Sequence, residues 1–216
     1  MNWSLLFRKR YDIHKIYPSI WDVPIYRKRH KLVKTHMKPG CRILDVGADK
    51  RLWTEKLKEL NYSYSSMDIN RSQKHDYYDL DNINETFDLI LLFEVIEHTS
   101  LLDGKKMLET LNKKLSSNGK IIISTPNIWV PTHYFRDATH VQPYAYDELG
   151  GLLNYCKFEV LDIWRIWNSH WLNRLTRLTF GKWLHRYIGI DFAKTIIIVA
   201  KKAERVTNND AEHLNR

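Results

Sequence analysis

The sequence predicts a doubly wound α/β fold, in which helices cover both faces of a mostly parallel sheet. Short apolar runs alternate with segments of helical periodicity along most of the chain, and a sheet with crossover helices accommodates this order most simply. The run FDLILLFEVI at residues 87–96 is apolar through its centre, which is typical of a strand buried on both faces of a parallel sheet. With 216 residues, 44% of them hydrophobic, the chain can close one core, so we expect one domain with appendages.

The first appendage is a basic, aromatic segment at residues 1–38. The first forty residues hold ten Lys or Arg against two Asp, with aromatic residues scattered among them. We interpret this segment as a helical arm that packs on the core. The turn signal MKPGC at residues 37–41 ends it.

The first half of the domain is predicted to contain four strands and one helix. Apolar residues recur at helical spacing from Leu52 to Leu60 after the first strand, which makes half of a βαβ unit. The second and third strands are short and polar and end in acidic residues. The predicted strands are 42–46, 62–67, 75–80 and 87–96, and the helix is 49–60.

The second half continues the alternation of helix and strand. Leucines on one helical face predict a helix at 101–115, and SSNG at residues 116–119 breaks it before the strand IIIS. Gly150 and Gly151 weaken the next predicted helix, since glycine disfavours helix interiors. The remaining elements are a helix at 147–155 and strands at 158–164 and 195–201.

The predicted domain therefore spans residues 39–203, with an insertion at 164–190 and a disordered tail at 204–216. The insertion holds four of the eight tryptophans and several arginines. It could form a lid over an acceptor, a face that rests on anionic lipid, or a helical pair packed on the core.

Composition limits the cellular setting and the partners. Two cysteines, Cys41 and Cys156, are too few for a disulfide framework, and no leader peptide or long apolar run is present, so we expect a cytoplasmic protein. A net charge of +9 and a pI near 9.4 favour attraction to nucleic acid, anionic lipid or an acidic substrate. Peripheral contact with the inner membrane surface and contact with nucleic acid both stay open.

Polar residues follow the predicted strands, where ligands bind in open parallel sheets. They are Asp45 and Gly47, then Asp68, then Asp79, then residues 94–98, then residues 125–127. A carboxylate after the second strand commonly accepts hydrogen bonds from ribose hydroxyls, and Asp68 is our candidate. Asp also ends strands simply because it favours turns.

The order of these motifs resembles the class I S-adenosylmethionine-dependent methyltransferases. ILDVG, SSMDI, FDLILLFEVIEH and LSSNGKIIISTPN carry the resemblance, which covers roughly residues 39–163 and the last strand. It implies a seven-stranded, Rossmann-like methyltransferase fold with S-adenosylmethionine as cofactor. FEVIEH, SSNGK and THVQPYAYDELGGLL are similar to bacterial enzymes that methylate small molecules and surface glycans. The first turn lacks GxGxxG, which argues against a nicotinamide cofactor.

The resemblance also implies roles for residues at the strand ends. The methionine part of the cofactor would lie at the loop after the first strand, the ribose after the second strand and the adenine after the third. The methyl donor would border the fourth strand. The implied cofactor-binding residues are Asp45, Gly47, Ala48, Asp49, Asp68, Ile69, Asp79, Leu80, Phe93 and Glu94.

Two histidines are candidate catalytic residues. A hydroxyl acceptor needs a base, and an imidazole ordinarily titrates near neutral pH, so His98 and His140 are the candidates. Each could instead only hydrogen-bond a loop. Glu94, Glu97, His98 and His140 also resemble the metal site of small-RNA 3′-terminal ribose methyltransferases, so a divalent metal is a second, less favoured expectation.

The loop after the first strand departs from the resemblance. Relatives show acidic-x-Gly-x-Gly-x-Gly, whereas Asp49 and Arg51 replace the later glycines here. Three functions follow from the sequence. The first is a methyltransferase acting on a small molecule or saccharide, and the second an RNA-directed ribose methyltransferase. The third is a non-catalytic protein that keeps the fold for binding.

Overall fold

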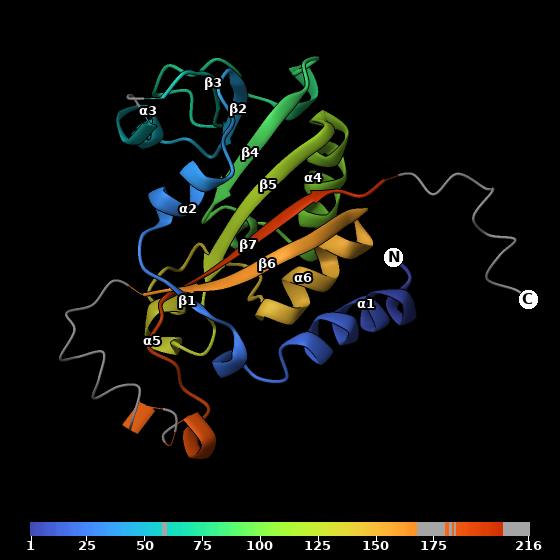
Figure 1. The fold of residues 1–216 in the computed structure, drawn as a ribbon, viewed down its shortest axis with the longest axis vertical. Coiled ribbons are helices and arrows are strands. Elements are labelled where there is room, and N and C mark those ends of the chain that lie inside the picture. The colour runs from blue at the N-terminus through green and yellow to red at the C-terminus, as the bar shows by residue number, and fades with distance from the viewer. Residues whose placement is uncertain (58–59, 168–179, 182, 184, 205–216) are drawn as a thin grey trace, which may run out of the picture.

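A computed structural model shows a seven-stranded sheet between helices (Figure 1). It describes the chain apart from residues 58–59, 168–179, 182, 184 and 205–216. The strand order is β1-β6-β7-β5-β4-β2-β3, and β7 alone runs antiparallel to its neighbours within the described sheet. The predicted doubly wound, mostly parallel α/β fold is confirmed.

The strands alternate with helices along the chain. The strands are β1 (Ile25–Tyr26), β2 (Cys41–Val46), β3 (Tyr62–Met67), β4 (Phe87–Phe93), β5 (Leu115–Pro126), β6 (Phe158–Ile166) and β7 (Thr195–Lys202). The α-helices are α1 (Trp3–Ile16), α2 (Arg29–Thr35), α3 (Leu52–Leu57), α4 (Leu101–Lys114), α5 (Pro131–Tyr134) and α6 (Tyr146–Tyr155). Short 3₁₀ helices are η1 (Ile20–Asp22), η2 (Leu80–Asn82) and η3 (Ile96–His98).

Each face of the sheet has its own core. On one face, buried residues of α4 and α6 pack against alternate residues of the central strands, such as Ile90 and Ile123. On the other face, α2 and α3 pack against the intervening residues, such as Leu91 and Ile122. This alternation explains why the central strands are apolar without interruption, because both sides of each strand are covered.

The N-terminal helix α1 forms an outer layer on α6 (Figure 1). A β-carbon at Gly151 would lie 2.6 Å from the backbone nitrogen of Arg10, and one at Gly150 would lie 3.1 Å from Ile13. The two glycines therefore allow the close approach of α1 to α6. Arg10 also pairs with Asp147 at 3.0 Å across this contact. The glycine pair that weakens helix α6 in isolation thus serves its packing.

Three predictions of secondary structure are wrong. Residues 75–80 do not form a strand, because Tyr77 makes only one isolated bridge, to Met67, and η2 follows. The strand predicted at 75–80 is therefore absent. The sheet still has seven strands, because β1, within the segment 1–38, was not predicted. The SSNG stretch at 116–119, predicted as a turn, belongs to β5.

The proposed insertion lies mostly outside the described residues. Its first residues, 164–166, end β6, and the described residues among 180–188 are helical. Trp183 is 61% exposed, and the predicted tail begins with Glu204, the last described residue. Among the described residues, no helix is long and apolar enough to cross a membrane.

A buried polar network ties the N-terminal segment to the sheet. The Arg165 guanidinium on β6 pairs with Asp191 at 2.9 Å, and both side chains are almost fully buried. The same guanidinium donates to the carbonyls of Val23 and Trp21, at 2.8 and 3.4 Å. Asn127, which follows β5, donates to Asp191 at 2.8 Å. Four distant parts of the chain therefore meet at this one ion pair.

Candidate functional site

The sheet brings the carboxyl ends of β2, β3, β4 and β5 together. Val46 at the end of β2 pairs with Met67 of β3 and with Leu92 of β4. Phe93 at the end of β4 pairs with Ser124 of β5. The polar residues that follow these strands therefore gather at one edge of the sheet, where open α/β folds bind ligands.

The loop after β2 keeps a left-handed backbone at three positions. Gly47, Asp49 and Arg51 have φ of 72°, 40° and 53°. Gly47 also has no room for a side chain, because a β-carbon there would clash with Val95 Cγ2. Asp49 and Arg51 occupy the positions at which glycine was expected from the resemblance. The loop therefore keeps the conformation that glycines would favour, although two glycines are missing.

Asp68 holds this loop in place. Its Oδ2 accepts a hydrogen bond from the Asp49 backbone nitrogen at 2.9 Å, and its Oδ1 accepts from Asn70 at 2.8 Å. Each carboxylate oxygen still has a lone pair for a further donor. Ile69, the next residue, is 82% exposed. Asp68 thus lies beside the loop and keeps acceptor capacity for a ligand.

The side chains of the altered loop point to partners after β3. Asp49 accepts from Gln73 at 3.1 Å, and Arg51 pairs with Asp76 at 3.3 Å. Asp76 in turn accepts from the backbone and hydroxyl of Ser66, at 2.8 and 2.7 Å. Gln73 and Asp76 supply these contacts, and Asp76 belongs to the segment 75–80 that was predicted as a strand. Ala48, within the loop, is buried.

Asp45 lies buried at the end of β2. Tyr64 on β3 donates its hydroxyl proton to Asp45 at 2.6 Å. Burial raises the pKa of Asp45 to about 6, although the Tyr64 hydrogen bond opposes the shift. The carboxyl group is therefore held by a neighbouring strand at the base of the loop.

Asp79 and Leu80 lie at the start of η2. The Asp79 carboxylate accepts from the backbone nitrogen of Asp81 at 3.0 Å and caps this short helix, while Leu80 packs partly against the core. The cap explains Asp79 without a ligand. The structure therefore gives these two residues a local role and leaves an adenine contact to be tested.

The end of β4 is covered by residues from two other elements. The Phe93 and Trp53 rings stack with their centroids 5.0 Å apart. The Arg29 guanidinium of α2 lies 5.0 Å from the centroid of the Phe93 ring. Glu94 has a φ of 55° and accepts from Arg29 at 3.1 Å and from the Ser124 hydroxyl at 2.7 Å. Arg29 thus contacts both residues that the resemblance places beside the methyl donor.

Glu97 is fully buried at 0% exposure. The Glu94 and Thr125 side chains lie near its carboxylate, but no described residue makes a hydrogen bond of ordinary geometry to either oxygen. Burial, reinforced by the negative charge of Glu94, raises the pKa of Glu97 to about 8. The group is therefore mostly protonated at neutral pH. A buried polar group without a partner is costly, which marks this position as a candidate functional residue.

The two histidines lie side by side, with ring centroids 4.9 Å apart. His140 Nδ1 lies 2.7 Å from the Tyr134 carbonyl oxygen, which can only accept, so Nδ1 carries the proton. His98 Nδ1 lies 3.2 Å from the Thr139 carbonyl oxygen and 3.0 Å from the Thr139 hydroxyl. Because that hydroxyl donates its proton to Asp137, His98 Nδ1 also donates. In both neutral imidazoles Nε2 keeps its lone pair, available to a proton or a metal ion.

Glu97, His98 and His140 form a cluster that could hold a metal ion, since one ligand atom from each lies within 4.8 Å of the others. A carbonyl holds Nδ1 of both histidines, as is common for imidazoles that bind metal through Nε2. Glu94, the fourth residue expected in this site, is outside the cluster and bonds to Arg29 and Ser124 instead.

Sequence reasoning missed four residues of this region: Arg29, Tyr64, Ser124 and Thr139. Arg29 belongs to a basic segment far from the strand ends in sequence, and only the fold brings it to Glu94. Tyr64 and Ser124 lie within strands, where alternation predicts their face but not their partner. Thr139 directly precedes His140 and could have been considered as its neighbour.

Comparison with known proteins agrees with this geometry. A family model described as a methyltransferase domain matches residues 18–187. No curated protein matches the sequence significantly. The match to the family model covers most of the chain, so the chain belongs to this methyltransferase domain family.

Solved structures share the fold at low sequence identity. An S-adenosylmethionine-dependent methyltransferase from Archaeoglobus fulgidus has a TM-score of 0.62 and 19% identity, over 93% of this chain and all of the other. A Haloferax volcanii methyltransferase, solved in complex with the Trm112 activator, has a TM-score of 0.59 and 13% identity, over 82% and 88% of the chains. A Mesorhizobium loti enzyme has a TM-score of 0.58 and 12% identity, over 80% and 96%.

The family and the fold together define an enzyme of the S-adenosylmethionine-dependent methyltransferase class, with S-adenosylmethionine as cofactor. The seven-stranded Rossmann-like sheet expected from the resemblance is confirmed.

Proposed function

We propose that this enzyme transfers a methyl group to a hydroxyl of a small molecule or saccharide, and that it acts in surface glycan biosynthesis. The observation that carries the proposal is the pair His98 and His140, whose Nε2 atoms both keep a lone pair at the carboxyl end of β4. A hydroxyl acceptor must lose its proton during transfer, and an imidazole beside the site can take it.

We assign the cofactor to the strand ends from Asp45 to Glu94. S-adenosylmethionine supplies a methyl group activated by a sulfonium. The loop at Gly47, Ala48 and Asp49 would hold its methionine part, since this backbone is left-handed and leads into α3. Asp68 would accept from the ribose hydroxyls with the lone pairs that Asp49 and Asn70 leave unused. Asp79 and Leu80 would face the adenine, and Phe93 and Glu94 the methyl group.

The enzyme's contribution to the transfer is alignment and exclusion of water, because the methyl group is already activated. His140 is the favoured base, since its side chain is 9% exposed and the Tyr134 carbonyl fixes its orientation. His98 is more exposed and would bind or orient the acceptor. Phe135 is 79% exposed beside Tyr134, and its ring offers a surface on which a sugar can stack.

The test is methyl transfer from labelled S-adenosylmethionine to free sugars, lipid-linked glycans and RNA oligonucleotides. We expect transfer to the saccharide acceptors, and His140→Asn should lower kcat by about a hundredfold or more. The Asn side chain can still donate to the Tyr134 carbonyl, so the local structure persists while the base is lost. Calorimetry should then show unchanged cofactor affinity. Transfer to RNA alone would contradict the proposal.

A second candidate function is metal-assisted methylation of ribose hydroxyls in RNA. The specific observation is the cluster of Glu97, His98 and His140. Its two imidazoles and one carboxylate could hold a divalent ion, which would orient vicinal hydroxyls of an acceptor. Metal analysis of the protein as purified, followed by activity with and without EDTA, distinguishes the two functions. The saccharide proposal expects activity that EDTA does not change.

A further inference from the structure

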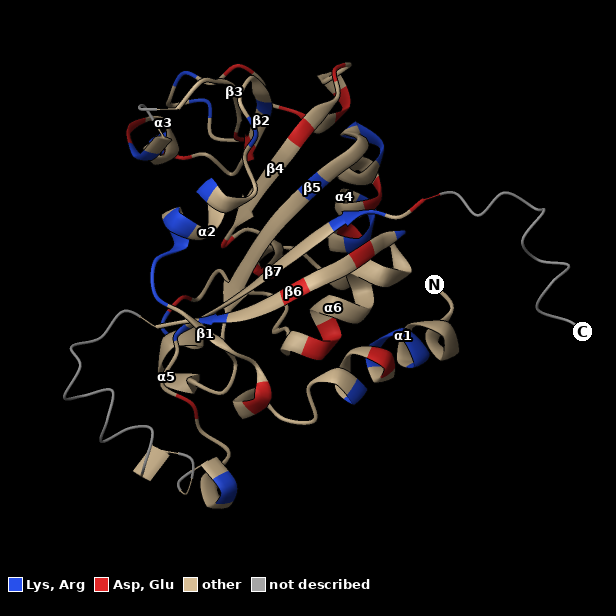
Figure 2. Ribbon diagram, viewed as in Figure 1, with Lys and Arg blue, Asp and Glu red and all other residues tan. Residues whose placement is uncertain are grey.

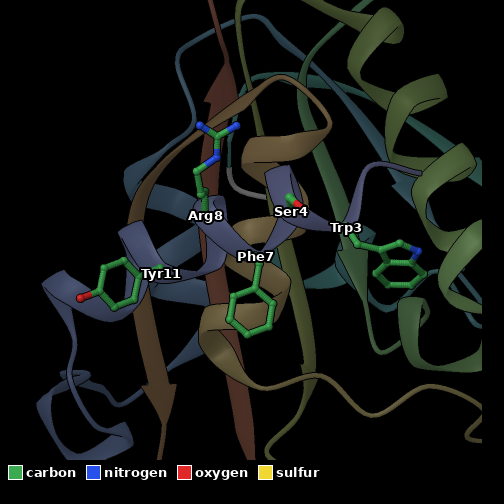
Figure 3. Close-up of a pocket in the computed structure, with 5 residues that line it drawn as sticks. All are labelled: Trp3, Ser4, Phe7, Arg8 and Tyr11. Carbon is green, nitrogen blue, oxygen red and sulfur yellow. The ribbon is translucent and has the colours of Figure 1, made fainter.

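The outer side of α1 carries a row of exposed aromatic side chains. Trp3, Phe7 and Tyr11 are 63%, 69% and 55% exposed and follow one another at intervals of four residues. Residues four apart lie on one face of a helix. Figure 3 shows the three rings on α1 around a shallow surface pocket that Ser4 and Arg8 also line.

The neighbouring side of α1 is already used for packing on α6. Ile13 is buried against α6, and Arg10 reaches Asp147 and Glu148 of α6 at 3.0 and 3.4 Å. The helix end is also fixed, since the Tyr146 hydroxyl donates to the Tyr17 carbonyl at 2.6 Å. The three rings nevertheless stay more than half exposed, although the Phe7 ring also lies 5.9 Å from the Arg10 guanidinium. Three large exposed rings in a row on a fixed helix need another explanation.

Basic side chains lie next to the rings. Arg8 is exposed beside Phe7, and the Lys15 ammonium lies 4.7 Å from the Tyr11 ring centroid. Asp12 is the one acidic residue of α1, and Lys15 lies 3.9 Å from it. The face therefore combines aromatic rings with positive charge, and Figure 2 shows the basic residues along α1.

We propose that this face of α1 binds the surface of an anionic lipid membrane. Trp and Tyr rings favour the boundary between headgroups and acyl chains, while Arg and Lys favour anionic headgroups. The positive charge also disfavours a second copy of the chain as the occupant, because two such faces would place Arg8 and Lys15 near their own counterparts. The aromatic row distinguishes the face from a purely electrostatic surface for nucleic acid.

This site differs from the one that the sequence suggested. The tryptophan-rich stretch at 164–190 was a candidate lipid face, but most of it lies outside the described residues. The site on α1 involves none of the residues at the strand ends, so it extends the proposed function without depending on it. Membrane binding and methyl transfer can therefore fail separately.

The experiment is cosedimentation of the full chain with vesicles. Vesicles of phosphatidylcholine with 30% phosphatidylglycerol are compared with vesicles of phosphatidylcholine alone, at about 0.1 M salt. We expect binding to the anionic vesicles only. The triple variant Trp3→Ser, Phe7→Ser, Tyr11→Ser and the double variant Arg8→Glu, Lys15→Glu should each bind at least about tenfold more weakly.

A matched variant controls for net charge. Lys106 and Lys113 are exposed on α4, so Lys106→Glu, Lys113→Glu changes the charge equally on another surface. This variant should bind within about twofold of the unmodified chain. Circular dichroism should show that all variants keep the fold, since every substituted side chain is exposed.

Three outcomes would overturn the proposal. The first is no binding of the unmodified chain to anionic vesicles. The second is equal weakening by the α4 control, which would indicate attraction through net charge alone. The third is a dimer in sedimentation velocity that the triple serine variant converts to a monomer, since the face would then bind a second copy of the chain.

Discussion

The protonation of Glu97 depends strongly on the fold. Burial raises its pKa to about 8 from an ordinary value near 4.5, so the folded state holds a proton that the unfolded chain releases between these two values. The stability contributed by this proton is fully present below pH 4.5 and is lost as the pH rises toward 8.

We therefore predict that Glu97→Gln changes the pH dependence of stability. Gln resembles the protonated acid, so the variant should unfold like the unmodified protein near pH 4.5 and be more stable at pH 8.5, by on the order of 1 to 3 kcal/mol. Urea unfolding at both pH values measures this. Asp45, whose pKa is also raised, is present in both proteins and cancels in the comparison. Equal stability of the two proteins at pH 8.5 would show that Glu97 ionises without cost.

Asp68 is the proposed ligand of the ribose hydroxyls of the cofactor, and this role can be tested with one substitution. Asp68→Ala should weaken S-adenosylmethionine binding at least about tenfold, because it removes the proposed ribose acceptors and the support of the Asp49 backbone nitrogen. Calorimetry measures the affinity. Asp103→Ala is the control, since Asp103 is an exposed carboxylate that accepts from Ser100 at 2.6 Å at the start of α4. If both variants bind the cofactor equally well, Asp68 is not the ribose ligand.

At the scale of single elements, the loop after β2 shows where sequence patterns mislead. Asp49 and Arg51 stand at two positions where the motif has glycine, yet both residues have a positive φ. The Asp49 side chain accepts a hydrogen bond from Gln73, and the Arg51 side chain pairs with Asp76. These contacts offset the cost of the left-handed backbone. A pattern based on residue type could not predict this, because the stabilising partners come from another segment.

Gly47 is the position in this loop that we predict cannot change. Gly47→Ala would meet both a positive φ and the Val95 side chain, so we expect a loss of about 3 kcal/mol in the free energy of unfolding. Gly40 is the matched control, since its φ is 75° but nothing lies within 4 Å of a β-carbon there. Gly40→Ala should cost about 1 kcal/mol. Similar losses in both variants, measured by urea unfolding, would mean that Val95 moves aside.

At the scale of the whole molecule, the Arg165 network connects the N-terminal segment, β6 and the segments around Asn127 and Asp191. Arg165→Leu leaves the Asp191 carboxylate buried without its counter-charge, so we expect a loss of about 3 to 5 kcal/mol in the free energy of unfolding. Adding Asp191→Asn removes that charge and should restore at least about half of the loss. Urea unfolding of the single and double variants tests this. No recovery would show that packing, rather than charge, dominates.

The sequence predicted most of the fold, because long apolar strands and amphipathic helices carry their own signals. The strand at 62–67 and the helix at 101–115 were predicted almost to the residue. The strand predicted at 75–80 was wrong, because its short run before acidic residues carries little signal and the Asp76 carboxylate there contacts Ser66 and Arg51 instead. β1 was missed because two residues in a basic segment give no periodicity.

The candidate site was predictable only in part. Residues that follow strands could be expected at one edge of the sheet, and the structure places Asp45, Asp68 and Glu94 there. The contact of Arg29 with Glu94 and the hydrogen bonds that fix His98 and His140 depend on tertiary structure. No periodicity or motif within one segment encodes such contacts.

The short strand β1 also bears on how copies of this protein behave in a crowded solution. Among the described residues, β1 pairs with only the last two residues of β6, so residues 158–164 have no strand partner on that side, although the Val160 backbone nitrogen donates to Asn154. An open edge of this kind can recruit strands from other chains and start aggregation. Glu159 and Asp162 lie along it, and the pairing of β6 with β7 shifts register between Val160 and Asp162. Charge and a bulge are features that discourage a foreign strand from adding, so the edge can stay open without making the protein prone to fibre growth.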